Sequence, residues 1–158
     1  MTHVIWRIAT DTPDYAADDM TGFGAKKTGG RWNRSGTPVL YCADNISLAC
    51  LETFVHIQSG GLPLNRYLIQ ISVPDDIWEE ARRYKKSPPV GWDAIPTGKV
   101  SLDAGQKWLT GNKTALLLVP SVIVHEETVV LINPAHPDAC RIKAKKIRKW
   151  EYDLRLAK

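Results

Sequence analysis

The sequence has no long apolar run. Its 158 residues contain no apolar stretch near the roughly 18 residues that a membrane span needs, so we expect a soluble chain with no membrane-bound part. The opening segment, MTHVIWRIATD, also lacks the basic and apolar regions of a secretory signal. Both absences predict a cytoplasmic protein.

Cysteine is scarce, and glycine fingerprints are missing. Cys42, Cys50 and Cys140 are an odd number without Cys-x-x-Cys spacing, which favours neither a disulfide framework nor a metal site. No Gly-x-Gly-x-x-Gly follows a predicted strand, so an NAD-dependent dehydrogenase has little support. Zinc-finger spacing, a ribonucleoprotein signature and a Gly-x-x-Gly clamp are absent too, so nucleic-acid binding would depend on charge alone.

Positive charge is present, with a net value of +4, and much of it lies in the late run RIKAKKIRKWEYDLRLAK. Its basic side chains include alternating positions, which would place charges on the wet face of a strand that also holds Ile142, Ile147 and Trp150. We expect a solvated edge strand. A small basic module that binds nucleic acid is the alternative of another class.

Short β-type runs dominate the apolar pattern, and helices are fewer. The length suits one domain, residues 1–158, and the mixture predicts the α+β class with short strands. A Pro- and Gly-rich segment, residues 85–99, looks like a long surface connection. The predicted strands are residues 4–8, 39–42, 67–73, 115–119, 121–124, 129–132 and 147–152. The predicted helices are residues 46–57, capped by Asp44 or Asn45 and closed by Gly60-Gly61, and residues 102–108, ended by Gly111.

The first predicted helix contains one carboxylate, Glu52, in an otherwise apolar segment. Steps of about 100° per residue place two apolar faces on this helix, so it should be buried on two sides. One face holds Ile46, Cys50, Phe54 and Ile57, and the other holds Leu48, Leu51 and Val55. Between them runs a narrow stripe with Glu52 and His56 at the i, i+4 spacing. This stripe is either a seam to solvent, where Glu52 pairs with its neighbour, or the wall of a pocket.

The preceding segment, GGRWN, supplies a cation, an aromatic ring and an amide in succession, as Arg31, Trp32 and Asn33. Arg binds phosphate well and Trp stacks on rings, so the three suit a ligand with a phosphate and a base. Tyr41 follows in the strand VLYCA, and the chain then turns into the Glu52 helix. Arg31, Tyr41 and Glu52 are therefore predicted to converge on one cleft.

These motifs, in this order, resemble the RES domain toxins of bacterial toxin-antitoxin modules, a family named for an Arg, a Glu and a Ser. The resemblance runs through most of the chain and assigns the three residues to Arg31, Glu52 and Ser121, with Tyr41 as the aromatic residue of the site. His56 and Asn133 match the surrounding pattern and are assigned to substrate binding. The motifs that carry it are WR, GGRWN, VLYCA, SLACLETFVH, VPSVI and LINPAHP.

The resemblance implies a fold similar to ADP-ribosyltransferases and an activity that consumes NAD+ as a substrate, not as a recycled cofactor. Glu52 would stabilise the oxocarbenium-like charge that develops when the bond between nicotinamide and ribose breaks. Arg31 would hold the pyrophosphate and Tyr41 would stack near the nicotinamide. Ser121 would bind the ribose or orient Glu52, and no activating arrangement marks it as a nucleophile.

The sequence does not decide which molecule accepts the ADP-ribose. Many protein-modifying ADP-ribosyltransferases carry a Glu or Gln two residues before the catalytic Glu, and here that position is Cys50. We therefore expect NAD+ breakdown by water or phosphate first, and transfer to a protein such as an enzyme of nucleotide metabolism second. The resemblance also implies an Xre-like antitoxin that covers the active site and through which alone DNA would be contacted, and growth arrest without it.

Overall fold

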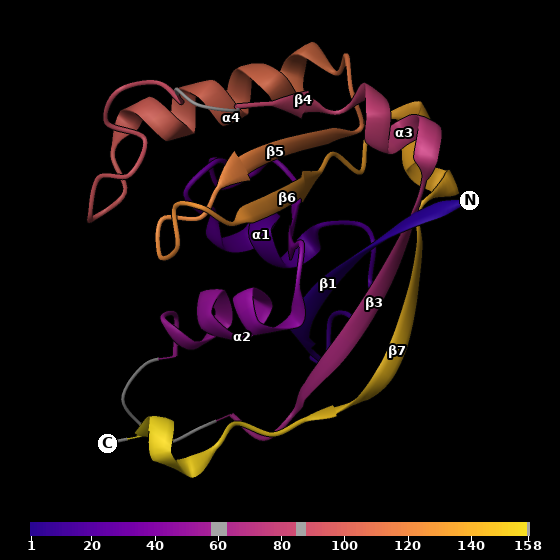
Figure 1. The fold of residues 1–158 in the computed structure, drawn as a ribbon, viewed down its shortest axis with the longest axis vertical. Coiled ribbons are helices and arrows are strands. Elements are labelled where there is room, and N and C mark those ends of the chain that lie inside the picture. The colour runs from indigo at the N-terminus through magenta and orange to yellow at the C-terminus, as the bar shows by residue number, and fades with distance from the viewer. Residues whose placement is uncertain (58–62, 85–87, 158) are drawn as a thin grey trace.

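A seven-stranded sheet with strand order β4-β5-β6-β2-β1-β3-β7 organises the chain (Figure 1). It is seen in a computed structural model that describes residues 1–57, 63–84 and 88–157. The strands are β1 Thr2–Thr10, β2 Leu40–Ala43, β3 Arg66–Pro74, β4 Arg82–Arg83, β5 Leu116–Pro120, β6 Thr128–Ile132 and β7 Lys143–Trp150. The helices are α1 Phe23–Thr28, α2 Ile46–Phe54, α3 Asp75–Glu80 and α4 Lys99–Gly111, with 3-10 turns at Pro137–Arg141 and Leu154–Ala157. The predicted α+β class is confirmed.

The sheet narrows where β1 meets β2. These strands pair only at Trp6 and Ala43, whereas β1 and β3 pair over their full length and β7 continues that ladder. On the other side β2, β6 and β5 form a second antiparallel ladder, and the short β4 joins β5 in parallel. Figure 1 shows the β1-β3-β7 strands turning away from β5 and β6, with α2 beside the region where they diverge.

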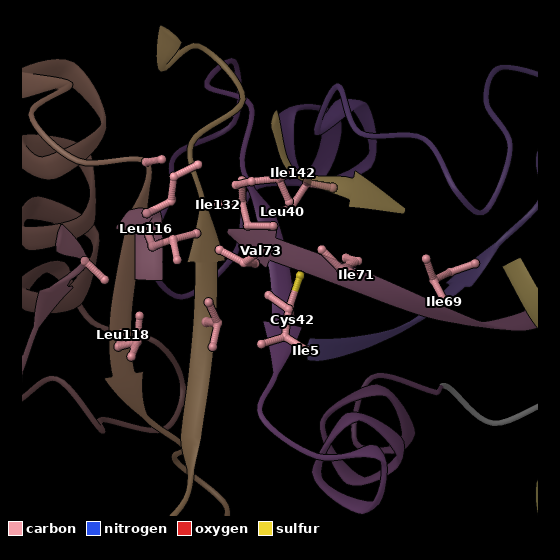
Figure 2. Close-up of a cluster of buried hydrophobic side chains, with 14 of the residues drawn as sticks. Ile5, Leu40, Cys42, Ile69, Ile71, Val73, Leu116, Leu118, Ile132 and Ile142 are labelled. Carbon is pink, nitrogen blue, oxygen red and sulfur yellow. The ribbon is translucent and has the colours of Figure 1, made fainter. Parts of the chain in front are cut away.

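Alternating side chains of the strands form two apolar cores, one on each face of the sheet, because successive residues of a strand point to opposite faces. One core contains Ile5, Leu40, Cys42 and Ile71, all nearly without exposed surface (Figure 2). The other joins the sheet to α2 and α4. Its members include Ile8, Trp32, Leu48, Trp108, Leu117 and Leu131. The second core fixes the helix that holds Glu52.

Most predicted strands are confirmed, but the strand predicted at residues 121–124 is wrong. There the Ser121 hydroxyl accepts hydrogen bonds from the backbone N–H groups of Ile123 and Val124, at 3.0 and 3.1 Å. A serine side chain that bonds the next N–H groups in this way makes a turn, so β5 ends at Pro120. The predicted strand at residues 147–152 begins earlier, at Lys143, and ends at Trp150.

Both predicted helices are present with shifted ends. Asn45 caps α2 by accepting from the N–H of Leu48 at 2.8 Å, as predicted, but the helix ends at Phe54. Gly60-Gly61, predicted to close it, lies outside the described residues. The second helix is longer than predicted. It ends at Gly111, as predicted, and Asn112 caps it in the left-handed conformation at φ 51°. The prediction missed α1, α3 and β4, which are too short to show a clear period.

Burial on two sides of α2 is only half right. Leu48 is fully buried, but Leu51 and Val55, predicted on the same face, are 39% and 56% exposed. One side of α2 lies against the sheet, and no helix or strand among the described residues covers the side that holds Leu51 and Val55. The surface connection predicted at residues 85–99 is also more than a connection, because Trp92 within it is buried in the second core and α4 begins at its end.

The basic late run forms β7 as a solvated edge strand, as predicted. It pairs with β3 on one side and its residues are mostly exposed. None of the helices within residues 1–57, 63–84 and 88–157 has the length and apolar character to cross a membrane.

Candidate active site

Glu52 lies half-buried on α2, one helical turn after the residues that anchor the helix. Leu48 and Ala49 are buried against the sheet, and the Asn45 cap fixes the first turn. Glu52 follows Ala49 by three residues and Leu48 by four, so it projects from the same side of the helix one turn later, where it is only half-buried. The carboxylate is therefore held by a rigid element yet can reach a ligand.

Ser121 contacts this carboxylate directly. Its hydroxyl donates a hydrogen bond to Oε1 of Glu52 at 2.6 Å and accepts from two backbone N–H groups of its own loop. The residue has no exposed surface, and its backbone N–H donates to the carbonyl of Glu127 at 2.9 Å, which closes the loop 121–127. Because the hydroxyl directs its one proton toward Glu52, it is arranged to orient the carboxylate. The other carboxylate oxygen, Oε2, makes no hydrogen bond to any residue that the structure describes.

The phenol of Tyr41 organises the GGRWN segment. It accepts a hydrogen bond from the N–H of Trp32 at 3.0 Å and donates one to Oδ1 of Asn33 at 2.6 Å. Burial raises the pKa of Tyr41, an effect opposed by the backbone N–H groups of Trp32 and Asn33 and by the nearby charge of Arg31. Tyr41 is therefore a neutral phenol at physiological pH, and it ties the loop to β2.

Close backbone approach is what lets this loop pack. A Cβ added at Gly30 would lie 2.7 Å from the Tyr41 hydroxyl, and one added at Gly105 would lie 1.8 Å from the carbonyl oxygen of Trp32. Real Cβ contacts of this length do not occur, so any side chain at Gly105 would push α4 away from the loop. Glycine at these two places allows β2, the loop and α4 to meet.

Asn33 and Trp32 face inward. Asn33 has no exposed surface, and its amide donates to the carbonyls of Ala25 and Thr37 at 2.9 and 3.0 Å. Trp32 is 2% exposed, and its ring stacks near those of Tyr84 and Trp92 with centroids 6.0 and 6.2 Å apart. Both residues, which were predicted to contact the ligand, thus make contacts within the protein. These contacts shape the loop around Arg31.

Arg31 is the residue of the segment that reaches across to another loop. Its Nη1 donates to the carbonyl oxygens of Trp92 and Ala94, at 3.0 and 2.8 Å. A guanidinium has five N–H groups in a planar fork, and its Nε and Nη2 make no hydrogen bond to any residue that the structure describes. Arg31 is anchored on one side and retains donors for an anionic group on the other.

A chain of contacts connects Arg31 with Glu52. The ring of Trp92, whose carbonyl binds Arg31, lies 5.2 Å from the ring of His125, and His125 belongs to the loop that begins with Ser121. Nε2 of His125 is also 3.9 Å from Oδ2 of Asp93. Through Trp92 and His125 the structure therefore connects the loop of Arg31 with the loop of Ser121, which contacts Glu52 on α2.

His56 and Asn133 are not drawn into this chain of contacts. The helix α2 ends at Phe54, and His56 lies two residues further along the chain, where it is exposed. Asn133 is buried at the opposite end of the β5-β6 ladder from Ser121, where its amide donates to the carbonyl of Leu109 at 3.2 Å and to Oδ1 of Asn112 at 3.0 Å. Asn133 secures the end of α4, and its assignment to the substrate stays a prediction.

Sequence reasoning did not predict that Trp92 and His125 connect the loops of Arg31 and Ser121. A buried tryptophan inside a Pro- and Gly-rich segment was the available signal, because a solvated connection seldom holds so large an apolar ring. Arg7 was noticed only as part of WR, and its Nη1 donates to the Tyr41 carbonyl at 3.3 Å. No cluster of His, Cys, Asp and Glu suited to a metal ion occurs among the described residues.

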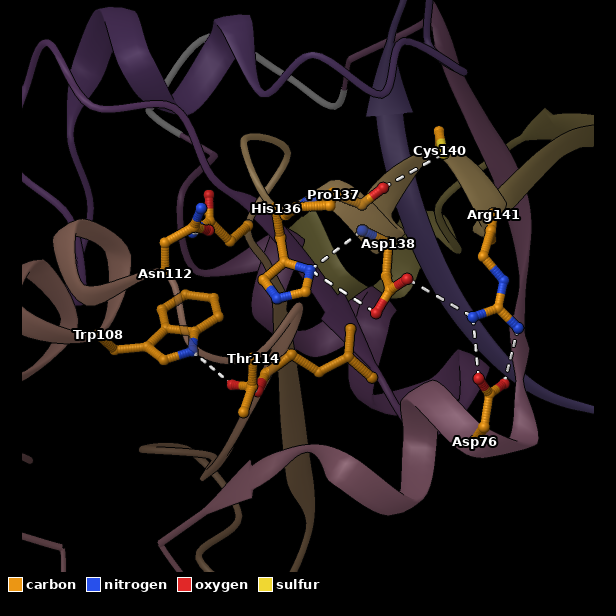
Figure 3. A network of polar contacts seen from close by, with 11 residues as sticks. Asp76, Trp108, Asn112, Thr114, His136, Pro137, Asp138, Cys140 and Arg141 are labelled. Carbon is orange, nitrogen blue, oxygen red and sulfur yellow. Dashed lines mark hydrogen bonds and ion pairs between the residues drawn. The ribbon is translucent and has the colours of Figure 1, made fainter.

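A surface cavity of about 410 Å³ lies beside the Arg31 segment. Its lining includes Gly29, Gly30 and Arg34, and Arg34 is paired with Asp103. The cavity provides backbone and guanidinium groups next to the residue predicted to bind phosphate. A second polar network, His136, Asp138, Arg141 and Asp76, lies elsewhere and fastens the segment before β7 to α3 (Figure 3).

Comparison with known proteins identifies relatives over nearly the whole chain. The model of the RES domain matches residues 4–155. A protein of Sphingobium sp. named Prs ADP-ribosylating toxin is 59% identical over 157 residues, which cover 99% of this chain and 98% of the relative. Proteins named Toxin Res from Yersinia enterocolitica and Pseudomonas putida are 38% and 34% identical, over 77% and 86% of this chain and 79% and 88% of theirs.

Proposed function

The chain belongs to the RES domain toxin family, and from this premise we propose that it consumes NAD+ by breaking the bond between nicotinamide and ribose. The observation that carries the proposal is the contact between Glu52 and Ser121. Nicotinamide leaves with the bonding electron pair, so positive charge develops on the ribose. A preoriented carboxylate beside that carbon stabilises charge that exists only in the transition state.

The remaining side chains suit the rest of the dinucleotide. Arg31, held by two carbonyl oxygens, would direct its other N–H groups to the pyrophosphate. Tyr41 would border the nicotinamide, and Trp32 and Asn33 would act through the loop that they stabilise. Residues 1–158 would together form one RES domain.

We propose a protein as the acceptor of ADP-ribose. Support comes from the relative that is 59% identical over 99% of this chain and is named for ADP-ribosylating Prs. In the transfer, a nucleophile of the acceptor forms a bond to the ribose carbon that nicotinamide has left and gives up its proton. The corresponding Prs of the same host is the first acceptor to test.

NAD+ breakdown with water or phosphate as acceptor is the second candidate, and Cys50 favours it. This residue stands two positions before Glu52, and burial raises the pKa of its thiol, so it remains a neutral thiol. It offers no carboxylate to activate a protein nucleophile at the position where many transferases have one. The product would then be free or phosphorylated ADP-ribose.

Nicotinamide release from NAD+ by the purified chain tests the proposal. We expect Glu52→Gln to lower the rate by about 100-fold or more, the scale for losing one electrostatic contact in a transition state. Glu80→Gln, an exposed glutamate on α3, should leave it unchanged. Full activity of a folded Glu52→Gln variant would refute the role of this residue. A mass balance on ADP-ribose, with Prs, water and phosphate offered, separates the two candidates.

We also propose a cognate antitoxin of the Xre-like kind that covers Arg31 and Glu52 and excludes NAD+. An enzyme that consumes NAD+ in its own cell requires such restraint, and DNA would be contacted through the antitoxin. Expression of the chain alone should arrest growth, and Arg31→Ala should relieve the arrest. Normal growth at a good yield of folded wild-type protein would contradict this.

A further inference from the structure

The outer edge of β7 is a sheet edge that no described residue pairs. The strand has eight residues, Lys143–Trp150, and forms its ladder with β3 on one side only. In an antiparallel strand, alternate residues turn their N–H and C=O groups away from the neighbouring strand. A row of backbone donors and acceptors therefore lies along this edge, which Figure 1 shows at the rim of the sheet.

The same strand carries a concentration of positive charge. Its sequence KAKKIRKW has five cations and no carboxylate. Lys146 is neutralised by Asp11, with both Nζ to carboxylate distances at 3.1 Å. The other four, Lys143, Lys145, Arg148 and Lys149, form no ion pair within the part of the chain that the structure describes. Their mutual repulsion would be relieved by an acidic partner.

These cations stand on both faces of the strand. Lys143, Lys145 and Arg148 lie opposite Ser72, Gln70 and Leu68, which share one face of β3, whereas Lys149 lies opposite Tyr67 on the other face. A phosphate backbone laid along one surface would meet only one of these sets. An added β-strand alternates its own side chains between the two faces, so acidic residues on it would meet cations on both.

We propose that this edge binds an acidic, extended segment of a protein partner, which adds to the sheet beside β7. Main-chain hydrogen bonds supply the pairing, and charge selects the segment. Lysines on an edge strand discourage pairing with a second copy of the same chain, whose edge carries the same charges. Like charges therefore disfavour self-association, and cations on both faces of β7 suit an acidic strand that meets them all, whereas a phosphate backbone against one face would leave Lys149 unmatched.

A synthetic decapeptide provides the probe. It combines valine and threonine with glutamates at both odd and even positions, so that glutamates occur on both faces of the extended chain. Its binding is followed by fluorescence anisotropy at two salt concentrations. A second peptide has the same side chains with N-methyl groups on alternate backbone nitrogens. We expect the first to bind in a salt-dependent way and to protect β7 amides from hydrogen exchange, and the second to bind at least ten times more weakly.

Charge reversal locates the site. Lys145→Glu combined with Lys149→Glu should weaken peptide binding at least tenfold. The matched control, Lys107→Glu with Lys113→Glu, makes the same change in net charge at exposed lysines of another surface and should leave binding unchanged. Circular dichroism confirms folding, and the glutamine versions of the β7 changes replace any variant that fails to fold. We expect nicotinamide release to be unchanged in every variant, so that the result does not depend on the proposed NAD+ chemistry.

Several results would overturn the proposal. Equal weakening by both double variants would show that binding depends only on net charge. Equal binding of the N-methylated peptide would exclude strand addition. Tighter binding of a generic DNA or RNA duplex, lost with the β7 changes, would assign the strand to nucleic acid. Dimerisation of the wild-type chain that the β7 changes abolish would assign it to a second copy.

Discussion

The hydroxyl of Ser121 donates to Oε1 of Glu52 at 2.6 Å, although 69 positions separate the two residues in the sequence. The serine is fully buried at the end of β5, while the glutamate projects from α2. One bond therefore connects the β5-β6 half of the sheet with the helix that packs beside it. Because the hydroxyl also accepts from two backbone N–H groups, its own orientation is fixed, and so is that of the carboxylate.

Replacing Ser121 by alanine should lower kcat for nicotinamide release more than it changes KM, since the serine positions Glu52 without binding most of the dinucleotide. It should also reduce the free energy of unfolding by about 1–3 kcal/mol, because two partly buried backbone N–H groups and the Glu52 carboxylate lose a hydrogen-bond partner. Ser101→Ala is the control. That serine is equally buried, but its hydroxyl has no partner among the described residues, so its loss should leave activity and stability nearly unchanged. An unaltered kcat in Ser121→Ala would contradict the positioning role.

The sequence predicted the strands of the sheet well because their apolar runs are buried and bounded by turn residues. It also placed Glu52 on a helix and offered orientation of Glu52 as one role for Ser121. It failed at residues 121–124, where the apolar pattern VIV favoured a strand while the serine side chain closed a turn. A local side-chain hydrogen bond of this kind leaves no trace in hydrophobic periodicity.

Contacts between distant loops were the other limit. Nothing in the sequence aligns Arg31 with the carbonyls of Trp92 and Ala94, because those groups belong to the backbone of an irregular segment. The exposure of Leu51 and Val55 was equally hidden, since helical periodicity shows which residues share a face but not how many faces find a partner.

Arg31→Lys should raise KM for NAD+ by about 10- to 100-fold, the effect of losing one charge-assisted hydrogen bond. Lysine keeps the charge but has a single ammonium nitrogen. Arginine can bind the two carbonyl oxygens through Nη1 and direct its other nitrogens to a phosphate, whereas lysine cannot do both. Steady-state kinetics of nicotinamide release provide the measurement, and Arg82→Lys, an exposed arginine on β4, serves as the control. An unchanged KM would indicate that Arg31 holds the loop and does not bind substrate.

Tyr41→Phe should destabilise the protein by about 1–3 kcal/mol, because the N–H of Trp32 and Oδ1 of Asn33 both lose their partner. Its pKa is raised by burial, so ionisation of Tyr41 should not appear in the pH profile of activity up to pH 10. Urea unfolding and a pH series on wild type and variant check both expectations. Tyr67→Phe is a matched control, since the Tyr67 hydroxyl makes no hydrogen bond to a described residue. A titration below pH 10 that vanishes in Tyr41→Phe would contradict the assignment of a neutral phenol.

Lys145 and Lys146 are adjacent in β7 but should respond differently to substitution by glutamine. Lys146 contacts the Asp11 carboxylate and lies 4.3 Å from the centre of the Tyr67 ring, whereas Lys145 makes neither contact. The pKa of Asp11 lies below its ordinary value of 3.8, first because the N–H of Ala17 donates to it and then because Lys146 does. A carboxyl group with a lowered folded-state pKa stabilises the protein above its unfolded-state pKa, and that contribution is lost as the pH falls through the folded-state pKa.

Lys146→Gln should therefore raise the pKa of Asp11 toward 3.8 and flatten the acid limb of the stability curve, while Lys145→Gln should change neither. Carbon NMR titration of the Asp11 carboxyl and thermal unfolding between pH 2 and pH 6 provide the two measurements. Part of the lowered pKa should survive in Lys146→Gln, since the hydrogen bond from Ala17, at 2.6 Å, remains. Both variants should release nicotinamide at the wild-type rate, because β7 lies at the sheet edge and neither lysine belongs to the loops of Arg31 and Ser121. Identical titration of Asp11 in the two variants would show that Lys146 is an ordinary surface lysine like its neighbour.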